Sequence, residues 1–170
     1  MNHWPERLAD WLWMPDDDPW PLLHNNPQGI VVHSGAVGSA VGEYAVNEPD
    51  GRDIAYHFVW FESRQDFVQT VALNRRAGHA GKDGNHWLGI AFPGPTSQDP
   101  RPDDQRDKFL TLVHALVGLS VTLPVPLVYW CRHSDFSTHR DPGPGFKDEW
   151  MHETGLMWLL ATARKGLELI

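Results

Sequence analysis

Three side chains that could bind a metal ion lie at the ends of predicted structural elements. His33 ends the apolar run GIVVH, and His133 and Asp141 enclose the segment HSDFSTHRD far along the chain. Two imidazoles and a carboxylate can bind zinc, and a catalytic zinc site keeps its fourth position for water. The residues alone leave this interpretation open, because the chain has 10 histidines and a lone histidine after a strand more often has a structural role.

The elements that would position these side chains follow from the pattern of apolar residues. Apolar and aromatic runs predict strands over Gly29–His33, Ala55–Glu62, Asp66–Val71 and Trp87–Phe92. The second and third of these strands are expected to form a hairpin, and Pro124–Trp130 leads in a further short strand. Helices are expected over Asp103–Leu119 and Trp150–Leu169. Strands that alternate with helices, with a hairpin among them, indicate an α/β fold: a single domain with a central mixed β-sheet flanked by helices.

The long helix over residues 103–119 carries its apolar side chains on one face, which we expect to pack on the sheet. One shared core is then expected to hold Val31, Phe58, Ile90, Leu112 and Leu116.

The domain organisation is that of one domain with a short extension. A length of 170 residues is typical of a single domain. Residues 1–28 are rich in Trp, Pro and Asp and are expected to be an N-terminal extension packed on the domain formed by residues 29–170. Within the extension, Pro5–Met14 has apolar residues at helical spacing and predicts a short helix.

Composition excludes several function classes. A net charge of -8 gives no support for a nucleic acid or an anionic membrane as partner. Cys131 is the one cysteine, so the chain forms no internal disulfide. No apolar run reaches the length of a membrane span, and the N-terminus lacks the pattern of a signal peptide. We therefore expect a protein made in a cytoplasm, without membrane insertion.

Five segments occur in an order that resembles a known family: GIVVHSG, AYHFVW, AGHAGKDGNHWLGIAF, PDDQRDKFLTLV and RHSDFSTHRDPGPGF. Together they resemble the zinc-dependent N-acetylmuramoyl-L-alanine amidases, the superfamily of type 2 amidases, peptidoglycan recognition proteins and phage lysozyme-amidases. The resemblance covers roughly residues 29–150. It implies one Zn²⁺ per chain, with His33, His133 and Asp141 as its ligands.

The resemblance also implies roles for four residues near the metal. Tyr56 matches a tyrosine that positions the water or the reacting carbonyl, although a core aromatic residue would look the same. His139 lies where relatives often have a lysine that stabilises the oxyanion, and the alternative is an exposed loop histidine. His79 and Asn85 match positions that line the substrate groove, and hydrogen bonds that fix the loop are the alternative.

Three further residues refine the comparison with this family. His57 is expected to point to the opposite side of its strand from Tyr56 and to have a structural role. Ala91 stands where the cytoplasmic recycling amidases have a catalytic glutamate, which favours the phage-like branch. Cys131 is not at the ligand position of the family and is interpreted as a buried strand cysteine.

The function implied by this resemblance is hydrolysis of the amide between the lactyl group of N-acetylmuramic acid and L-alanine of the stem peptide. The partner is bacterial peptidoglycan, and the protein is expected to act as a monomer. The setting it suggests is a phage endolysin, held in the host cytoplasm before release to the wall. Two alternatives stay open: a non-catalytic module that binds muropeptide, and a zinc hydrolase of another amide.

Overall fold

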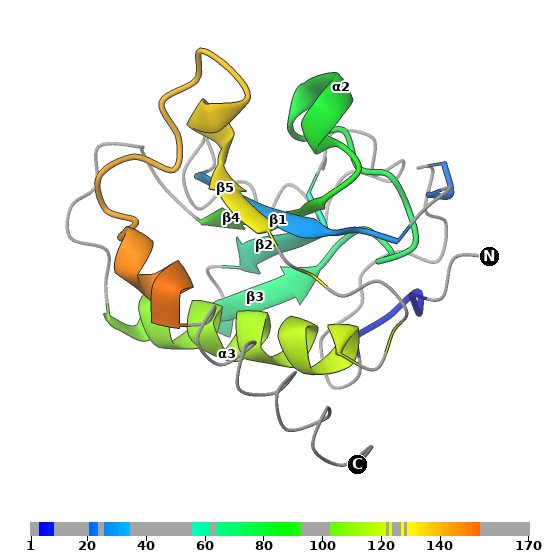
Figure 1. Ribbon diagram of the computed structural model, residues 1–170. Coiled ribbons are helices and arrows are strands. Elements are labelled where there is room, and N and C mark those ends of the chain that lie inside the picture. The colour runs from blue at the N-terminus through cyan, green and yellow to red at the C-terminus, as the bar shows by residue number, and fades with distance from the viewer. Residues whose placement is uncertain are drawn as a thin grey trace, which may run out of the picture.

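The computed structural model describes residues 4–8, 21–23, 26–34, 56–61, 64–92, 103–121, 123, 127 and 129–153. The predictions for residues 9–14, and for the C-terminal helix beyond residue 153, lie outside the described residues. The described part forms one five-stranded sheet with the strand order β3-β2-β4-β1-β5 (Figure 1). This confirms the predicted α/β fold with a central mixed sheet.

The strands are β1 (Gly29–Ser34), β2 (Phe58–Phe61), β3 (Asp66–Gln69), β4 (Leu88–Phe92) and β5 (Tyr129–Arg132). β1 is parallel to β4 and β5, and β2 is parallel to β4. β2 and β3 form the predicted antiparallel hairpin. β2 starts three residues later than predicted, and β5 continues two residues beyond Trp130. That extension matters because it carries β5 up to His133.

Helix α3 (Asp103–Ser120) lies along one face of the sheet, whereas α2 (Gly81–Gly84) and the turn after β5 lie on the opposite side (Figure 1). The apolar stripe of α3 packs on alternate residues of the strands, and burying each such side chain contributes about 1.5–3 kcal/mol. The core formed in this way contains, among others, Phe109, Leu112, Leu116, Ile30, Val32, Phe58 and Ile90. Residues 148–153 are helical and add Trp150 and Met151 to the same core.

Val31 is buried, but the prediction that it shares this core is wrong. Side chains along a strand alternate between the two faces of a sheet. Since Ile30 and Val32 face α3, Val31 and His33 point to the other face. The sheet therefore has a core face, which α3 covers, and a second face that carries the candidate metal ligands.

The N-terminal segment contacts the domain through both its side chains and its backbone. Trp4 and Leu8 are buried in the core, and the Glu6 carbonyl accepts hydrogen bonds from the Gln69 side chain and the Leu73 amide. Gln69 also accepts a hydrogen bond from the Leu8 amide at 2.9 Å. These bonds use backbone groups that a helix would need, and residues 4–8 form no helix.

The sequence did not predict two short elements, α2 and the 3-10 helix η2 (His133–Asp135). Both lie beside the candidate metal ligands. Among the described helices, none combines the length and the apolar character that a membrane span needs.

Candidate metal centre

The three predicted metal ligands come together at one edge of the sheet. His33 lies near the carboxyl end of β1, and the register pairs Val32 with Arg132, so the next residue of β5's chain, His133, lies beside His33. Their ring centroids are 4.5 Å apart. Carboxyl ends of parallel strands are the common location for ligand sites in α/β sheets.

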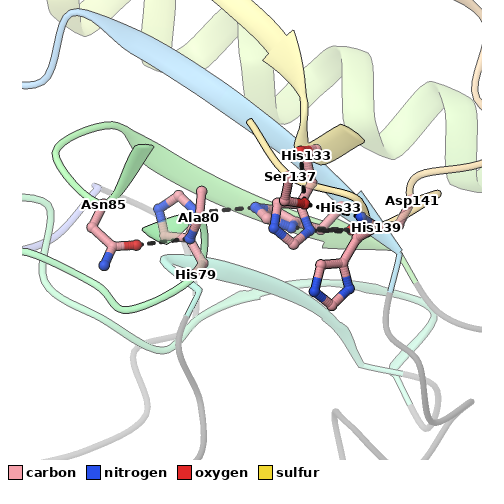
Figure 2. A network of polar contacts seen from close by, with 8 residues as sticks. All are labelled: His33, His79, Ala80, Asn85, His133, Ser137, His139 and Asp141. Carbon is pink, nitrogen blue, oxygen red and sulfur yellow. Dashed lines mark hydrogen bonds and ion pairs between the residues drawn. The ribbon is translucent and has the colours of Figure 1, made fainter. Parts of the chain in front are cut away.

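Asp141 returns to this edge from the loop after η2. The amide of Ser134 donates a hydrogen bond to the Asp141 carbonyl at 3.1 Å, which ties the end of the loop to its beginning. The Asp141 carboxylate then lies between the two histidines, 3.2 Å from His33 Nδ1 and 2.9 Å from His133 Nδ1 (Figure 2).

The spacing of these atoms fits a zinc ion. One ligand atom from each of His33, His133 and Asp141 lies within 4.8 Å of the other two. Zinc–ligand bonds of about 2.0–2.1 Å in a tetrahedron separate neighbouring ligand atoms by about 3.4 Å. The two observed carboxylate–imidazole separations are already close to this value, and two nitrogens and one carboxylate are a donor set that zinc accepts.

Burial sets the protonation of the cluster. His33 is fully buried, and desolvation lowers its pKa to about 4, although the Asp141 carboxylate, which would accept a hydrogen bond from the protonated ring, opposes this shift. Burial by itself would raise the pKa of Asp141, but the contacts with His33 and His133 outweigh it and hold that pKa below its usual value. At neutral pH the site therefore offers a carboxylate and a neutral His33 imidazole, which are the forms that bind metal.

Arg132 anchors the loop beside the candidate ligands, and the sequence interpretation did not identify it. Its guanidinium donates two hydrogen bonds to Asp148, at 2.9 and 2.6 Å, and further ones to the carbonyls of Gly143 and Phe146. Arg132 is the last residue of β5, so these bonds fix the loop that follows Asp141 to the strand that precedes His133. Its position directly before a ligand was the available signal, but its partners lie 11 to 16 residues away.

Tyr56 lies beside the cluster. Its ring centroid is 4.8 Å from that of His33, and the ring packs on Val59 and Ala91. Ala91 on β4 is paired with His33 on β1, and its side chain is a methyl group without a polar atom. The nearby polar atom is instead the hydroxyl of Tyr56. Burial and the charge of Asp141 raise the pKa of the Tyr56 hydroxyl, which therefore keeps its proton and can donate it in a hydrogen bond. This hydroxyl has no hydrogen-bond partner among the described residues.

His139 is exposed and stacks on the ligand His133. The two ring centroids are 4.8 Å apart, and the ring planes differ by 19°. Ser137 connects the two residues, because its hydroxyl contacts the His133 carbonyl and accepts a hydrogen bond from the His139 amide. The side chain is thus held at the rim of the cluster; its predicted assistance to the reaction stays a prediction.

His79 and Asn85 bracket the helix α2, and both make contacts within the protein (Figure 2). The Asn85 side-chain oxygen accepts a hydrogen bond from the Ala80 amide at 2.7 Å, the loop-fixing role that we kept as an alternative. His79 is buried, with one ring nitrogen 2.9 Å from His33 Nε2 and the other 2.9 Å from the Trp87 carbonyl. Its predicted contact with muropeptide is untested, but both of its nitrogens already have partners.

Two residues that we placed outside the site behave differently from each other. The structural role of His57 is confirmed: the fully buried ring accepts a hydrogen bond from the Gly89 amide and contacts the Arg75 carbonyl. Cys131 lies on β5 as predicted but is only partly buried. Desolvation raises the pKa of its thiol to about 12, so the thiol is a poor metal ligand and nucleophile at neutral pH.

Comparison with known proteins agrees with this geometry. The fold is similar to that of an endolysin amidase from Clostridium intestinale (19% identity, TM-score 0.63, covering 85% of this chain and 93% of that one) and of AmpD (20%, 0.64, covering 88% and 97%). It is also similar to a human peptidoglycan recognition protein in complex with glycosamyl muramyl pentapeptide (16%, 0.60, covering 78% and 86%). These identities show a shared fold, and no curated protein matches the sequence. The sequence profile of the N-acetylmuramoyl-L-alanine amidases matches residues 23–144, which include all three clustered ligands, and the chain therefore belongs to that amidase family.

Proposed function

We propose that the protein is a zinc-dependent peptidoglycan hydrolase that cleaves the amide between the lactyl group of N-acetylmuramic acid and L-alanine. The observation that carries this proposal is the cluster of the buried His33 and Asp141 with the half-buried His133, in a chain that belongs to the amidase family. Retention of all three ligand residues favours catalysis over binding alone.

The residues around the cluster support specific parts of the reaction. A bound zinc ion would supply a Lewis acid for the scissile carbonyl and lower the pKa of an attacking water towards about 7. The Tyr56 hydroxyl keeps its proton and would orient the water or the carbonyl oxygen from the side of β2. His139, at the exposed rim, would donate a hydrogen bond to the oxyanion, and loss of such a donor typically costs about a hundredfold to a thousandfold in rate.

The experiment is digestion of purified peptidoglycan, with the products measured by mass spectrometry and the zinc content measured in the same samples. We expect free stem peptides and intact glycan strands from the wild-type protein. Asp141→Ala should lose both zinc and activity. His114→Ala is the matched control, since His114 is exposed on α3 and should be dispensable. Zinc-loaded wild-type protein that releases no stem peptides would refute the proposal.

The second candidate function is muropeptide binding without cleavage. It is favoured by the similarity to the recognition protein that was crystallised with a muramyl pentapeptide. Binding of a muramyl peptide by zinc-loaded protein, without cleavage, would establish this function. Cleavage of a different amide by the same protein would instead indicate a zinc hydrolase of another substrate.

We further propose that the protein acts as a monomeric phage endolysin, stored in the host cytoplasm before release to the wall. The wall-cleaving chemistry of the family and the net charge of -8, which gives no general attraction to anionic surfaces, support a soluble enzyme with local recognition. Expression with and without a membrane-permeabilising partner tests this. Lysis should need the partner; lysis without it would contradict cytoplasmic storage.

A further inference from the structure

A continuous chain of contacts leads from the sheet backbone to the candidate metal ligands. The Trp87 carbonyl is 2.9 Å from His79 Nε2, and His79 Nδ1 is 2.9 Å from His33 Nε2. His33 Nδ1 in turn faces Asp141 at 3.2 Å (Figure 2). Among the residues that the structure describes, His79 is thus the one that joins His33 to the backbone on the side away from Asp141.

Counting protons along this chain leaves a single arrangement that satisfies both contacts of His79. A carbonyl oxygen only accepts hydrogen bonds, so the contact with Trp87 requires a proton on His79 Nε2. A neutral imidazole has one N–H, so His79 Nδ1 is then an acceptor. The 2.9 Å contact between the two rings therefore requires the proton of His33 to be on Nε2.

This arrangement leaves His33 Nδ1 with a lone pair and no proton, 3.2 Å from a carboxylate. Three contacts need three protons, but two neutral rings supply only two. The deficit lies between His33 and Asp141, where a lone pair and an anion face each other. A cation at that point would satisfy both groups.

We propose that His79 is a positioning residue: it holds the proton of His33 on Nε2 and so directs the lone pair of Nδ1 at the metal. This inference rests on the proposed function in one respect, zinc binding at the metal centre, and does not depend on the cleavage of peptidoglycan. Histidines that bind metal commonly donate their other N–H to a partner that fixes the ring, and such partners affect metal affinity by about 10–100-fold. Here the partner is a second histidine, itself fixed by the Trp87 carbonyl.

The surroundings of His79 hold its ring in one place. A Cβ on Gly89 would lie 2.8 Å from two carbon atoms of the His79 ring, so the ring packs directly on the bare backbone of β4. That backbone is fixed by His57, which accepts a hydrogen bond from the Gly89 amide at 3.0 Å and whose own amide donates to the Gly89 carbonyl at 2.9 Å. The position of His79 is therefore determined by packing as well as by its two polar contacts.

The direct test is the ¹⁵N NMR spectrum of the histidine side chains in metal-free protein, which distinguishes the two neutral tautomers. We expect both His79 and His33 to carry their proton on Nε2. A wild-type spectrum with the His33 proton on Nδ1 would overturn the proposal without any variant.

Two substitutions of His79 extend the test to zinc affinity, measured by competition with a chelator. His79→Phe keeps an aromatic ring but has no acceptor, so the His33 proton should move towards Asp141 and zinc binding should weaken about 10–100-fold. His79→Asn keeps an acceptor oxygen near the position of Nδ1 and should retain more of the affinity. His114→Asn is the control, since it removes an exposed histidine of α3 that lies away from the cluster.

Equal zinc affinity in the wild type and the Phe variant would overturn the proposal. Equal weakening in the Phe and Asn variants would also overturn it, because packing of the ring alone would then explain the effect. Protein that binds zinc with these tautomers but cleaves no peptidoglycan would refute the proposed function and leave the role of His79 intact.

Discussion

Gly89→Ala is the sharpest perturbation of the site that adds only one methyl group. Gly89 lies on β4, and its added Cβ would be 2.8 Å from Cγ and Cδ2 of His79 and 3.0 Å from Nδ1. Non-bonded carbon atoms prefer a separation of about 3.5–4.0 Å, so the His79 ring would have to move by roughly 0.7 Å. The strand itself cannot retreat easily, because His57 bonds both polar backbone groups of Gly89.

The magnitude follows from two opposing effects. Overpacking a buried site typically costs about 1–3 kcal/mol. Replacing a glycine inside a strand recovers about 0.5–1 kcal/mol of chain entropy. The net expectation is a loss of up to about 2.5 kcal/mol in the free energy of unfolding, which for a chain of this length lowers the melting temperature by up to roughly 10 °C. Zinc affinity should fall as well, because moving the ring lengthens its 2.9 Å contact with His33.

The assay is urea denaturation together with chelator competition, with Gly118→Ala as the matched control. Gly118 is exposed in the last turn of α3, and an added Cβ there meets nothing within 4 Å. The same chemical change should stabilise the control by about 0.5–1 kcal/mol and leave zinc affinity unchanged. If Gly89→Ala matches the control in both measurements, the reasoning about His79 is wrong.

Three other predictions concern separate parts of the site. Arg132→Lys should weaken zinc binding several-fold at unchanged secondary structure, because lysine cannot make the paired bonds to Asp148; unchanged affinity would show that the loop needs no such anchor. His139→Ala should keep zinc but lose turnover, and His139→Lys, which restores a hydrogen-bond donor, should retain activity; wild-type rates in the alanine variant would contradict this. Burial lowers the pKa of His57 to about 4, from about 6.5 in the unfolded chain, so the unfolded state binds more protons between these values. Stability should therefore fall as pH drops from about 6.5 to 4, by up to about 3 kcal/mol for this residue. The acid loss should be smaller in His57→Gln, and equal slopes in the two proteins would refute the assignment.

The sequence predicted the elements whose pattern is strong and local. The apolar stripe of α3 and the apolar run of β1 are each expected to be buried in the core, and the bounds of both elements were predicted within a residue or two. The pattern of β1 did not reveal which of its two faces meets the helix, because GIVV is apolar on both. His33 could have settled this: a polar ligand at residue 33 requires the odd-numbered positions to face away from α3.

The sequence predicted which residues gather at the site, since the three candidate ligands, Tyr56 and His139 all lie in or beside the cluster. The resemblance to a family identified positions, and the structure brings those positions together. The resemblance gave no information on hydrogen-bond partners such as the His33–His79 contact, which joins residues 46 positions apart in sequence. Arg132 was missed for the same reason, since its partners lie on a loop whose path depends on the completed fold.

Zinc should also stabilise the fold, and the arrangement of the buried histidines explains why. His33, His57 and His79 are all buried, and the ring centroid of His79 is 5.0 Å from that of His33 and 5.8 Å from that of His57. Both ring nitrogens of His57 have backbone partners, the Arg75 carbonyl and the Gly89 amide, whether or not a metal ion is bound. His33 is not satisfied in this way, because its Nδ1 lone pair faces the Asp141 carboxylate until a cation lies between them. Zinc at about 100 times its dissociation constant should add about 2.7 kcal/mol to the free energy of unfolding. Asp141→Ala should abolish this dependence on zinc, because it removes one of the three candidate ligands and the anion that faces His33; a variant that kept the full zinc-dependent gain would contradict the assignment of Asp141 as a ligand.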